Sequence, residues 1–216
     1  MPSTKDLTNF PDPRTLESAW KSCAILDIIF CEEAAYRTFD YQAAWSEKAR
    51  VGRYDNGGGD HMIVFFTGTS AILKGFAHES PVSPHAREEY EVWPGMYDKV
   101  PGALFEFLED DSVEHEEVTF CVWYASGSWK TGKVVFPGGE DDGSSFLLEA
   151  IHVTPDDHAE WARYNYECVI DMPTVRAVYD GEPITADMIA LLNPQRNVIQ
   201  ALEEIQAMCP ETDTKP

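Results

Sequence analysis

Residues 61–76 read HMIVFFTGTSAILKGF, and they carry the clearest strand signal in the chain. An apolar run rich in β-branched and aromatic residues covers 61–67, which is the length of a strand. The small polar segment GTS follows at 68–70, and a second apolar run covers 71–76. A buried strand, a tight reversal and a returning strand fit this order of residues. The sequence therefore predicts a β-hairpin here.

Further strands are predicted on both sides of this hairpin. YRTFDYQAAW and KARVGRY, which begin at Tyr36 and Lys48, are aromatic and β-tolerant. A β-rich run covers 118–124, and GKVVFP at 132–137 is its predicted partner strand. Together these segments predict a largely antiparallel sheet.

Helices are predicted at both ends of the chain. Asp12 and Pro13 are typical of a helix start, and apolar residues then recur at helical spacing, which predicts a helix over 13–32. Asp27 falls on the apolar stripe of this helix, so its carboxylate should point inward and be anchored by a hydrogen bond or have a raised pKa. A short helix opening near Pro101 should bury Leu104, Phe107 and Leu108.

Four helical segments are predicted after the strands. The first covers 144–150, and the second begins at a capping box of Thr154 and Asp157 and carries Trp161, Ala162, Tyr166 and Val169. Thr185 caps the third, around ADMIALL, and Asn193 with Pro194 begins the last. This order predicts an α+β fold: a mostly antiparallel sheet with an N-terminal helix and a C-terminal set of helices packed on it.

The length of 216 residues suits one domain. We predict a single α+β domain over 13–209, with a flexible N-terminus at 1–12 and a flexible tail at 210–216. The oligomeric state has no signature in the sequence. Six tryptophans are present, and Trp93, Trp123, Trp129 and Trp161 are predicted to lie in the core or at its edge, or to anchor an interface.

The charge of the chain narrows the classes of partner. It has 38 acidic and 16 basic residues, a net charge of -22 that comes from missing Lys and Arg. Such a field repels nucleic-acid phosphates and anionic membranes and attracts basic proteins. We therefore expect the partner to be a basic protein, and we expect no nucleic acid and no membrane among the partners. The alternative is that the acidity only keeps the protein soluble.

The N-terminus and the cysteines indicate the compartment. The first residues, MPSTKDLTNFPDP, contain no apolar stretch of signal-peptide length, so we expect a cytoplasmic protein. Five cysteines are scattered without CxxC spacing and sit mostly among apolar residues, as reduced thiols do.

The segment GFAHESPVSPH at 75–85 is the first candidate site. His78, Glu79 and His85 could ligate a metal, and Ser80 or Ser83 could be a nucleophile beside a histidine. The HExxH spacing fails, because Val82 stands where the second histidine would be. Prolines 81 and 84 favour a rigid connector or a partner-facing loop, and both readings stay open.

An acidic run at 106–117 is the second candidate site. Seven of its twelve residues are Asp or Glu, which would make a docking surface for Lys and Arg. The residues predicted to bind the partner are Glu109, Asp110, Asp111, Glu114, Glu116 and Glu117. His115 and Glu117 match half of the zinc deaminase signature, but no PCxxC follows, which excludes that reading.

Several motifs together resemble a known family. GFAHES, WPGMYD, VTFCVW, DDGSSFLL, WARYNYE and LNP occur in this order over most of the chain. The set resembles a family of small, uncharacterised bacterial cytoplasmic proteins, associated with the immunity and accessory proteins of polymorphic toxins. Ala77 departs from the Asp that the family pattern carries, which weakens a ligand role for this loop.

Two functions follow as hypotheses. The first is a non-enzymatic, acidic protein-binding protein, an immunity protein that neutralises a basic toxin or effector, with no catalytic residues and no cofactor. The second is a small metal-dependent hydrolase that uses His78, Glu79 and His85, with Asp27 nearby.

Overall fold

The chain forms two compact units in a computed structural model that describes residues 2–136, 141–167 and 169–210. Unit 1 consists of Met1–Arg14 and Arg53–Ile151, and unit 2 of Thr15–Gly52 and His152–Pro216. The prediction of one domain over 13–209 stays a prediction. Of the predicted tail at 210–216, residues 211–216 lie outside the described residues.

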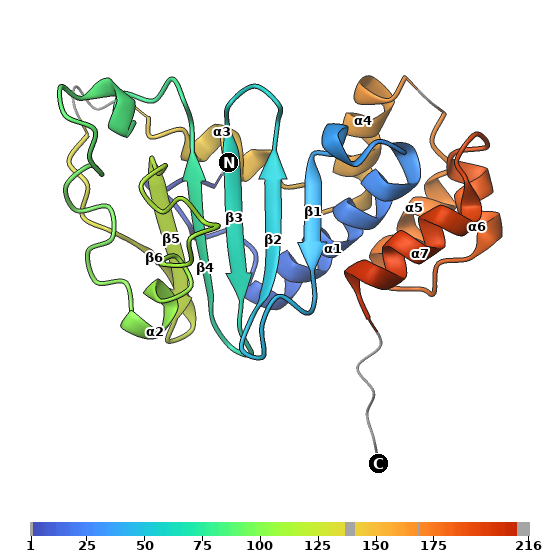
Figure 1. The fold of residues 1–216 in the computed structure, drawn as a ribbon, viewed down its shortest axis with the longest axis horizontal. Helices are drawn as coiled ribbons and strands as arrows, with labels where there is room; N and C mark the ends of the chain where they lie inside the picture. Colours follow the sequence, from blue (N-terminus) through green and yellow to red (C-terminus); the bar gives the residue numbers. More distant parts are fainter. Residues whose placement is uncertain (1, 137–140, 168, 211–216) are drawn as a thin grey trace, which may run out of the picture. The chain divides into compact units, whose positions relative to one another are not determined.

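Six strands form an antiparallel sheet, as Figure 1 shows. They are β1 (Phe39–Gln42), β2 (Arg50–Asp55), β3 (His61–Phe66), β4 (Ala71–Phe76), β5 (Phe120–Ala125) and β6 (Ser128–Thr131). The strands follow one another across the sheet in sequence order. With the N-terminal and C-terminal helices, this sheet confirms the predicted α+β class.

The predicted hairpin is confirmed as β3 and β4. Ile63 pairs with Lys74 and Val64 with Leu73, and every residue of β4 is buried. β4 then pairs with β5, where Gly75 faces Phe120. A Cβ atom at Gly75 would lie 2.2 Å from the ring of Phe120, so this position requires glycine.

The predicted partner strand at 132–137 is wrong. β5 instead reverses at Ser126 and Gly127, whose φ angles of 56° and 79° give the left-handed turn that matches the twist of a hairpin. The chain therefore returns at once, and Ser128–Thr131 occupy the pairing positions beside β5. Residues 132–136 follow without strand structure, and Pro137 lies outside the described residues.

The N-terminal helix is confirmed as α1 (Pro13–Phe30). Asp27 is fully buried, and its carboxylate accepts hydrogen bonds from the amides of Thr38 and Phe39 at 2.8 and 2.7 Å and from the Tyr166 hydroxyl at 3.0 Å. Loss of solvent outweighs these hydrogen bonds and raises the pKa of Asp27 to about 6. The predicted inward orientation is therefore confirmed.

The remaining helices agree in part with the predictions. They are α2 (Gly102–Phe105) and α3 (Ser144–Glu149) in unit 1, and α4 (Pro155–Asn165), α5 (Met172–Tyr179), α6 (Ala186–Leu192) and α7 (Val198–Met208) in unit 2. The capping box of Thr154 and Asp157 is present at the start of α4. In unit 2, α5 contacts α4 and α6, and α6 contacts α7 (Figure 1).

Three helix predictions need correction. α5 was not predicted, and Val169 lies beyond the end of α4, where it is 92% exposed. α7 begins at Val198 with Asn197 as its cap, not at Asn193. The side chain of Asn193 instead donates to the carbonyls of Ile29 and Phe30, at the C-terminal end of α1. No described helix combines the length and apolarity needed to cross a bilayer.

Unit 2 contains a buried cluster of histidines and aromatic rings. The ring of His158 lies 5.5 Å from that of His152 and 5.4 Å from that of Trp161, and neither of its nitrogens has a hydrogen-bond partner in the described residues. Tyr179 donates to the carbonyl of His152 at 2.7 Å and lies 3.4 Å from the thiol of Cys23. Burial lowers the pKa of His152 to about 4 and that of His158 to about 3.

The described cysteines are all free thiols. They are Cys23, Cys31, Cys121 and Cys209, while Cys168 lies outside the described residues. Burial raises the pKa of Cys23 to about 12, and it raises the pKa of Cys121 as well. These two thiols are therefore protonated and unreactive at neutral pH.

Candidate functional site

The histidine loop, residues 77–90, leaves β4 as a series of tight turns. The amide of Ser80 donates to the Ala77 carbonyl, and that of Ser83 to the Ser80 carbonyl, each at 2.9 Å. The Ser83 hydroxyl then accepts from the amide of His85 at the short helix η2 (Pro84–Ala86). Ser80 and Ser83 are 7% and 1% exposed, so these candidate nucleophiles face inward and hold the turns.

His78 points outward beside a carboxylate from the turn before β3. Its ring Nδ1 lies 2.8 Å from Asp60, whose Oδ1 also accepts from the His78 amide at 2.9 Å. The hydrogen bond that His78 donates to Asp60 raises the pKa of His78. Burial acts to raise the pKa of Asp60, but the hydrogen bonds from His78 outweigh it and keep that pKa below its ordinary value. Glu79 is 3.8 Å from the other ring nitrogen, and its side chain is 89% exposed.

His85 pairs with the acidic run instead. Its Nε2 lies 2.9 Å from Glu117, and the Tyr90 hydroxyl donates to the same carboxylate oxygen at 2.7 Å. The rings of His85 and Tyr90 also pack against each other, with centroids 5.0 Å apart. Burial, followed by the charge and hydrogen bond of Glu117, raises the pKa of Tyr90. Glu117 therefore joins the two candidate segments of the sequence.

The three residues proposed as metal ligands have different nearest partners. His78 pairs with Asp60, and His85 with Glu117, while Glu79 extends into solvent. Within 2–136, 141–167 and 169–210, no three His, Cys, Asp or Glu side chains gather as a metal site would require. Asp27, proposed as a nearby group, belongs to unit 2, whereas the histidine loop belongs to unit 1.

The acidic loop, residues 109–117, presents most of its carboxylates to solvent. Of the six predicted residues, Glu117 is half-buried and the others are exposed: Glu109, Asp110, Asp111, Glu114 and Glu116. Asp110 turns back on its own loop, because it accepts from the amide and hydroxyl of Ser112 at 3.0 and 2.5 Å, and these bonds lower its pKa. The loop is thus a row of carboxylates and not a pocket.

A buried lysine holds this loop from the sheet side. Lys74 of β4 is 1% exposed, and its ammonium donates to the carbonyls of Glu114 and Glu117 at 2.9 and 2.6 Å. Burial lowers the pKa of Lys74 to about 8, although the two glutamates oppose that shift. The Tyr97 hydroxyl donates to the carbonyl of His115 between them. Three carbonyls of one loop are therefore fixed by side chains.

Sequence reasoning missed three residues of this site: Asp60, Lys74 and Tyr90. Lys74 had a readable signal, because it is the one charged residue in the apolar strand AILKGF and a buried lysine needs acceptors. Asp60 and Tyr90 had no such signal in the sequence, because their hydrogen-bond partners, His78 and Glu117, lie 18 and 27 residues away in the chain.

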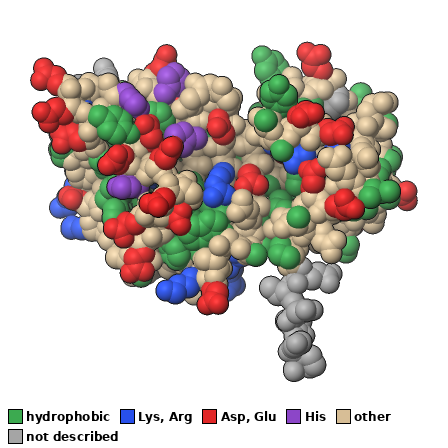
Figure 2. Space-filling model, in the orientation of Figure 1, with side chains coloured by type: hydrophobic (Ala, Val, Ile, Leu, Met, Phe, Trp, Pro, Cys, Tyr) green, Lys and Arg blue, Asp and Glu red, His purple; other side chains and the backbone are tan. Residues whose placement is uncertain are grey.

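Figure 2 shows this face of the molecule. Histidine side chains gather there among Asp and Glu side chains, over the part of unit 1 that carries β4, β5 and the loops between them. Lys74 contributes no cationic surface, because its ammonium is buried under the acidic loop. The face is therefore negative, with titratable histidines inside it.

Comparisons of the chain with protein-family models, with curated proteins and with solved structures found no match.

Proposed function

We propose that this protein binds a basic protein partner through the acidic loop and the adjoining histidine loop of unit 1. In this proposal the partner is a toxin or effector in a bacterial cytoplasm, and binding neutralises it by covering its active site. The net charge of -22 supports a cationic partner, because the field accelerates the approach of positive surfaces. The resemblance to an uncharacterised bacterial family associated with the immunity and accessory proteins of polymorphic toxins supports the same class of partner.

One observation carries the proposal: Lys74 and Tyr97 fix the backbone of the acidic loop from below. A loop that is already ordered loses little conformational entropy on binding, so more of the interaction energy appears as affinity. Burying an ammonium group costs free energy, and here that cost is offset by hydrogen bonds to the acidic loop itself. Its exposed carboxylates are thus preorganised for a partner.

Glu117 is the expected centre of the contact. It is half-buried and already accepts from His85 and Tyr90, so its position is fixed more firmly than that of the exposed glutamates. Tyr90 is 48% exposed beside it and offers the aromatic surface that interfaces favour. Glu114 and Glu116 would then steer a basic surface toward this centre.

The test uses the full chain and the basic protein that co-purifies with it from its native cell. The affinity of that identified protein is measured by calorimetry at two salt concentrations, for the unmodified chain and for the variant with Glu114, Glu116 and Glu117 changed to Gln. We expect affinity to fall roughly 10- to 100-fold in the variant and to fall with added salt.

A matched control removes the same charge from unit 2. The variant with Glu32, Glu33 and Glu47 changed to Gln alters three exposed glutamates outside the acidic loop. Equal losses in the two variants would contradict a specific acidic face, and salt-insensitive binding would contradict electrostatic steering.

A metal-dependent hydrolase is the weaker proposal. His78 and His85 hydrogen-bond to different carboxylates, so no observation favours a shared metal between them. Metal analysis of the purified chain, with His78→Ala as the comparison, tests it directly.

A further inference from the structure

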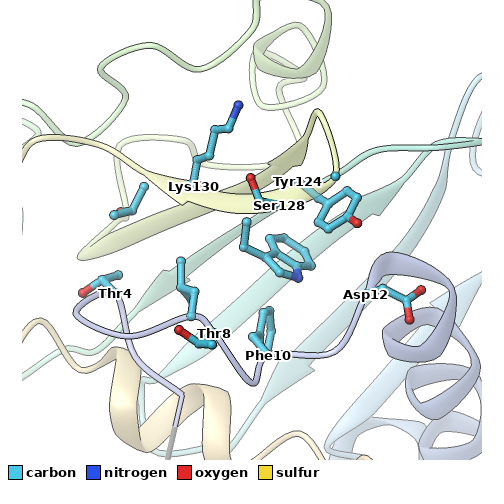
Figure 3. Close-up of a pocket in the computed structure, with 11 residues that line it drawn as sticks. Thr4, Thr8, Phe10, Asp12, Tyr124, Ser128 and Lys130 are labelled. Atoms are coloured by element: carbon cyan, nitrogen blue, oxygen red, sulfur yellow. The ribbon is translucent and has the colours of Figure 1, made fainter.

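A groove of about 520 Å³ lies in unit 1 between the N-terminal segment and the β5–β6 hairpin. In Figure 3, Thr8 and Phe10 lie along one side of it, and Tyr124, Ser128 and Lys130 along the other. The volume falls in the range of small-molecule sites. The residues that line the groove come from segments other than the histidine loop and the acidic loop.

The floor of the groove is an aromatic platform. The indole ring of Trp129 packs against Phe10, with centroids 4.9 Å apart, and against Tyr124 at 5.5 Å. Its Nε1 donates to the carbonyl of Pro11 at 2.7 Å, which fixes the orientation of the ring. Phe10 is buried, whereas Trp129 and Tyr124 are half-buried and line the groove with the rest of their surfaces.

Polar groups surround this platform. The hydroxyls of Tyr124 and Ser128 make no hydrogen bond to any part of the chain that the structure describes, and both residues line the groove. Lys130 is exposed at the same rim. Each of these groups can donate a hydrogen bond to a ligand, and the two hydroxyls can also accept one.

The chemistry of the groove excludes two classes of ligand. Phe10 and Tyr124 each pack against Trp129, so the rings do not form an open cage around an alkylammonium ion, and Lys130 repels such an ion at the rim. The net charge of -22 disfavours an anionic ligand such as a nucleotide. A neutral ligand with one flat apolar face and several hydroxyl groups satisfies both conditions.

We propose that this groove binds a neutral sugar ring. The C–H face of the ring stacks on the Trp129 indole, which lies nearly perpendicular to the Tyr124 ring. Its hydroxyl groups exchange hydrogen bonds with Tyr124 and Ser128 and accept one from Lys130. This site is separate from the proposed partner-binding face, and it adds a small-molecule ligand to a protein that is otherwise expected to bind another protein.

The test is saturation-transfer NMR on the full chain with defined probes. Methyl glycosides of glucose, galactose, mannose and N-acetylglucosamine, together with maltose and cellobiose, are compared with adenosine monophosphate. We expect at least one sugar to bind with a Kd of ~1 mM, with the strongest transfer to its ring C–H protons. Trp129→Leu should weaken that affinity at least roughly tenfold. Tyr124→Phe should weaken it about three- to tenfold, because it removes one hydrogen bond and leaves the ring.

Matched variants keep the outcome interpretable. Trp93→Leu changes another half-buried tryptophan of unit 1 and should leave sugar affinity unchanged. The glutamine variant of Glu114, Glu116 and Glu117 should also leave it unchanged, which separates this site from the partner-binding face. If Trp129→Leu does not fold, Tyr124→Phe and Ser128→Ala carry the test. Absence of binding by every sugar, tighter binding of the nucleotide, or equal losses in Trp93→Leu and Tyr124→Phe would overturn the proposal.

Discussion

His78 of unit 1 and the pair His152 and His158 of unit 2 lie in opposite environments. In unit 1 the His78 side chain is 47% exposed and pairs with Asp60, and this partner raises its pKa. In unit 2 His152 and His158 are 8% and 0% exposed among aromatic rings, and burial lowers their pKa values to about 4 and about 3. A carboxylate stabilises the imidazolium in the first case, and loss of solvent disfavours it in the second.

This difference in environment gives the exposed and the buried histidines different roles. At His78 the neighbouring Asp60 favours the charged imidazolium, so this histidine contributes to the charge that a partner meets. The buried pair stays uncharged near neutral pH, so a change of pH reaches it only as a change in the free energy of unfolding.

Acidification should have the largest effect. Below pH 6.5 the unfolded chain protonates His152 and His158 while the folded chain keeps them neutral until about pH 4 and 3, so stability is lost as pH falls through this window. Asp27 acts in the opposite direction, because its folded pKa of about 6 lies above its unfolded value. We expect the free energy of unfolding to fall by a net of about 4 kcal/mol between pH 7 and pH 4, measured by urea unfolding.

Variants locate the source of this pH dependence. Changing both His152 and His158 to Phe should remove the loss of stability between pH 6.5 and 4 and leave the opposite contribution of Asp27, so that stability rises slightly as pH falls, whereas His78→Gln should leave the profile nearly unchanged. Besides burial, the exposed Asp157 opposes the lowering of the His152 pKa, and His152 itself adds to the lowering of the His158 pKa. A flat profile for the unmodified chain would contradict the contrast between the units.

Lys74→Met should give the next largest effect. The change leaves the carbonyls of Glu114 and Glu117 without their buried donor, and we expect the free energy of unfolding to drop by about 3 kcal/mol. Hydrogen exchange should speed up at the amides of residues 113–118. Lys99→Met, at an exposed lysine of unit 1, is the control and should change neither quantity measurably.

His158→Phe should stabilise the protein at pH 7. The two ring nitrogens are buried without partners, which costs free energy that an apolar ring of similar shape avoids. We expect a gain of about 1 kcal/mol in the free energy of unfolding, because part of the benefit is lost to the larger ring. A decrease in the free energy of unfolding of this variant at pH 7 would show that a solvent molecule or ion hydrogen-bonds to the His158 imidazole in the unmodified chain.

Asp60→Asn should give the smallest effect, a shift in one titration. Removing the carboxylate should lower the pKa of His78 toward its ordinary value, followed by NMR of the ring protons. The signals of His152 and His158 should not move. A His78 pKa that stays raised would mean that Glu79, and not Asp60, controls it.

Local patterns predicted the long and strongly periodic elements of the fold. The hairpin at 61–76 and α1 are strongly apolar and have distinct turn or cap residues, so each could be read without its surroundings. α5 has only eight residues, and one residue separates its cap Asp171 from Pro173. At α1, Asp12 and Pro13 are adjacent and give a clear helix-start signal, which α5 lacks. The β5–β6 turn was missed because it places Ser126 at a positive φ, where glycine is the usual signal.

The sequence predicted which residue types make up the candidate site, but it did not predict how they are arranged in space. The carboxylates of the acidic loop are exposed, as a hydrophilic run should be. The pairing of His85 with Glu117 joins residues 32 apart, and it depends on which strands lie between them and on their register. Sequence spacing alone carries no such information.

Each unit consists of two segments that are distant in the chain, and this affects the order in which the protein matures at the ribosome. Cys23 of α1 meets Tyr179, which is synthesised 156 residues later. At 5–20 residues per second, α1 leaves the ribosome roughly 10 to 30 s before that partner exists. Residues of β1 and β2 can cover part of its apolar side early, but the part that contacts Tyr179 stays open to chaperones and other nascent chains until the last third of the polypeptide is made.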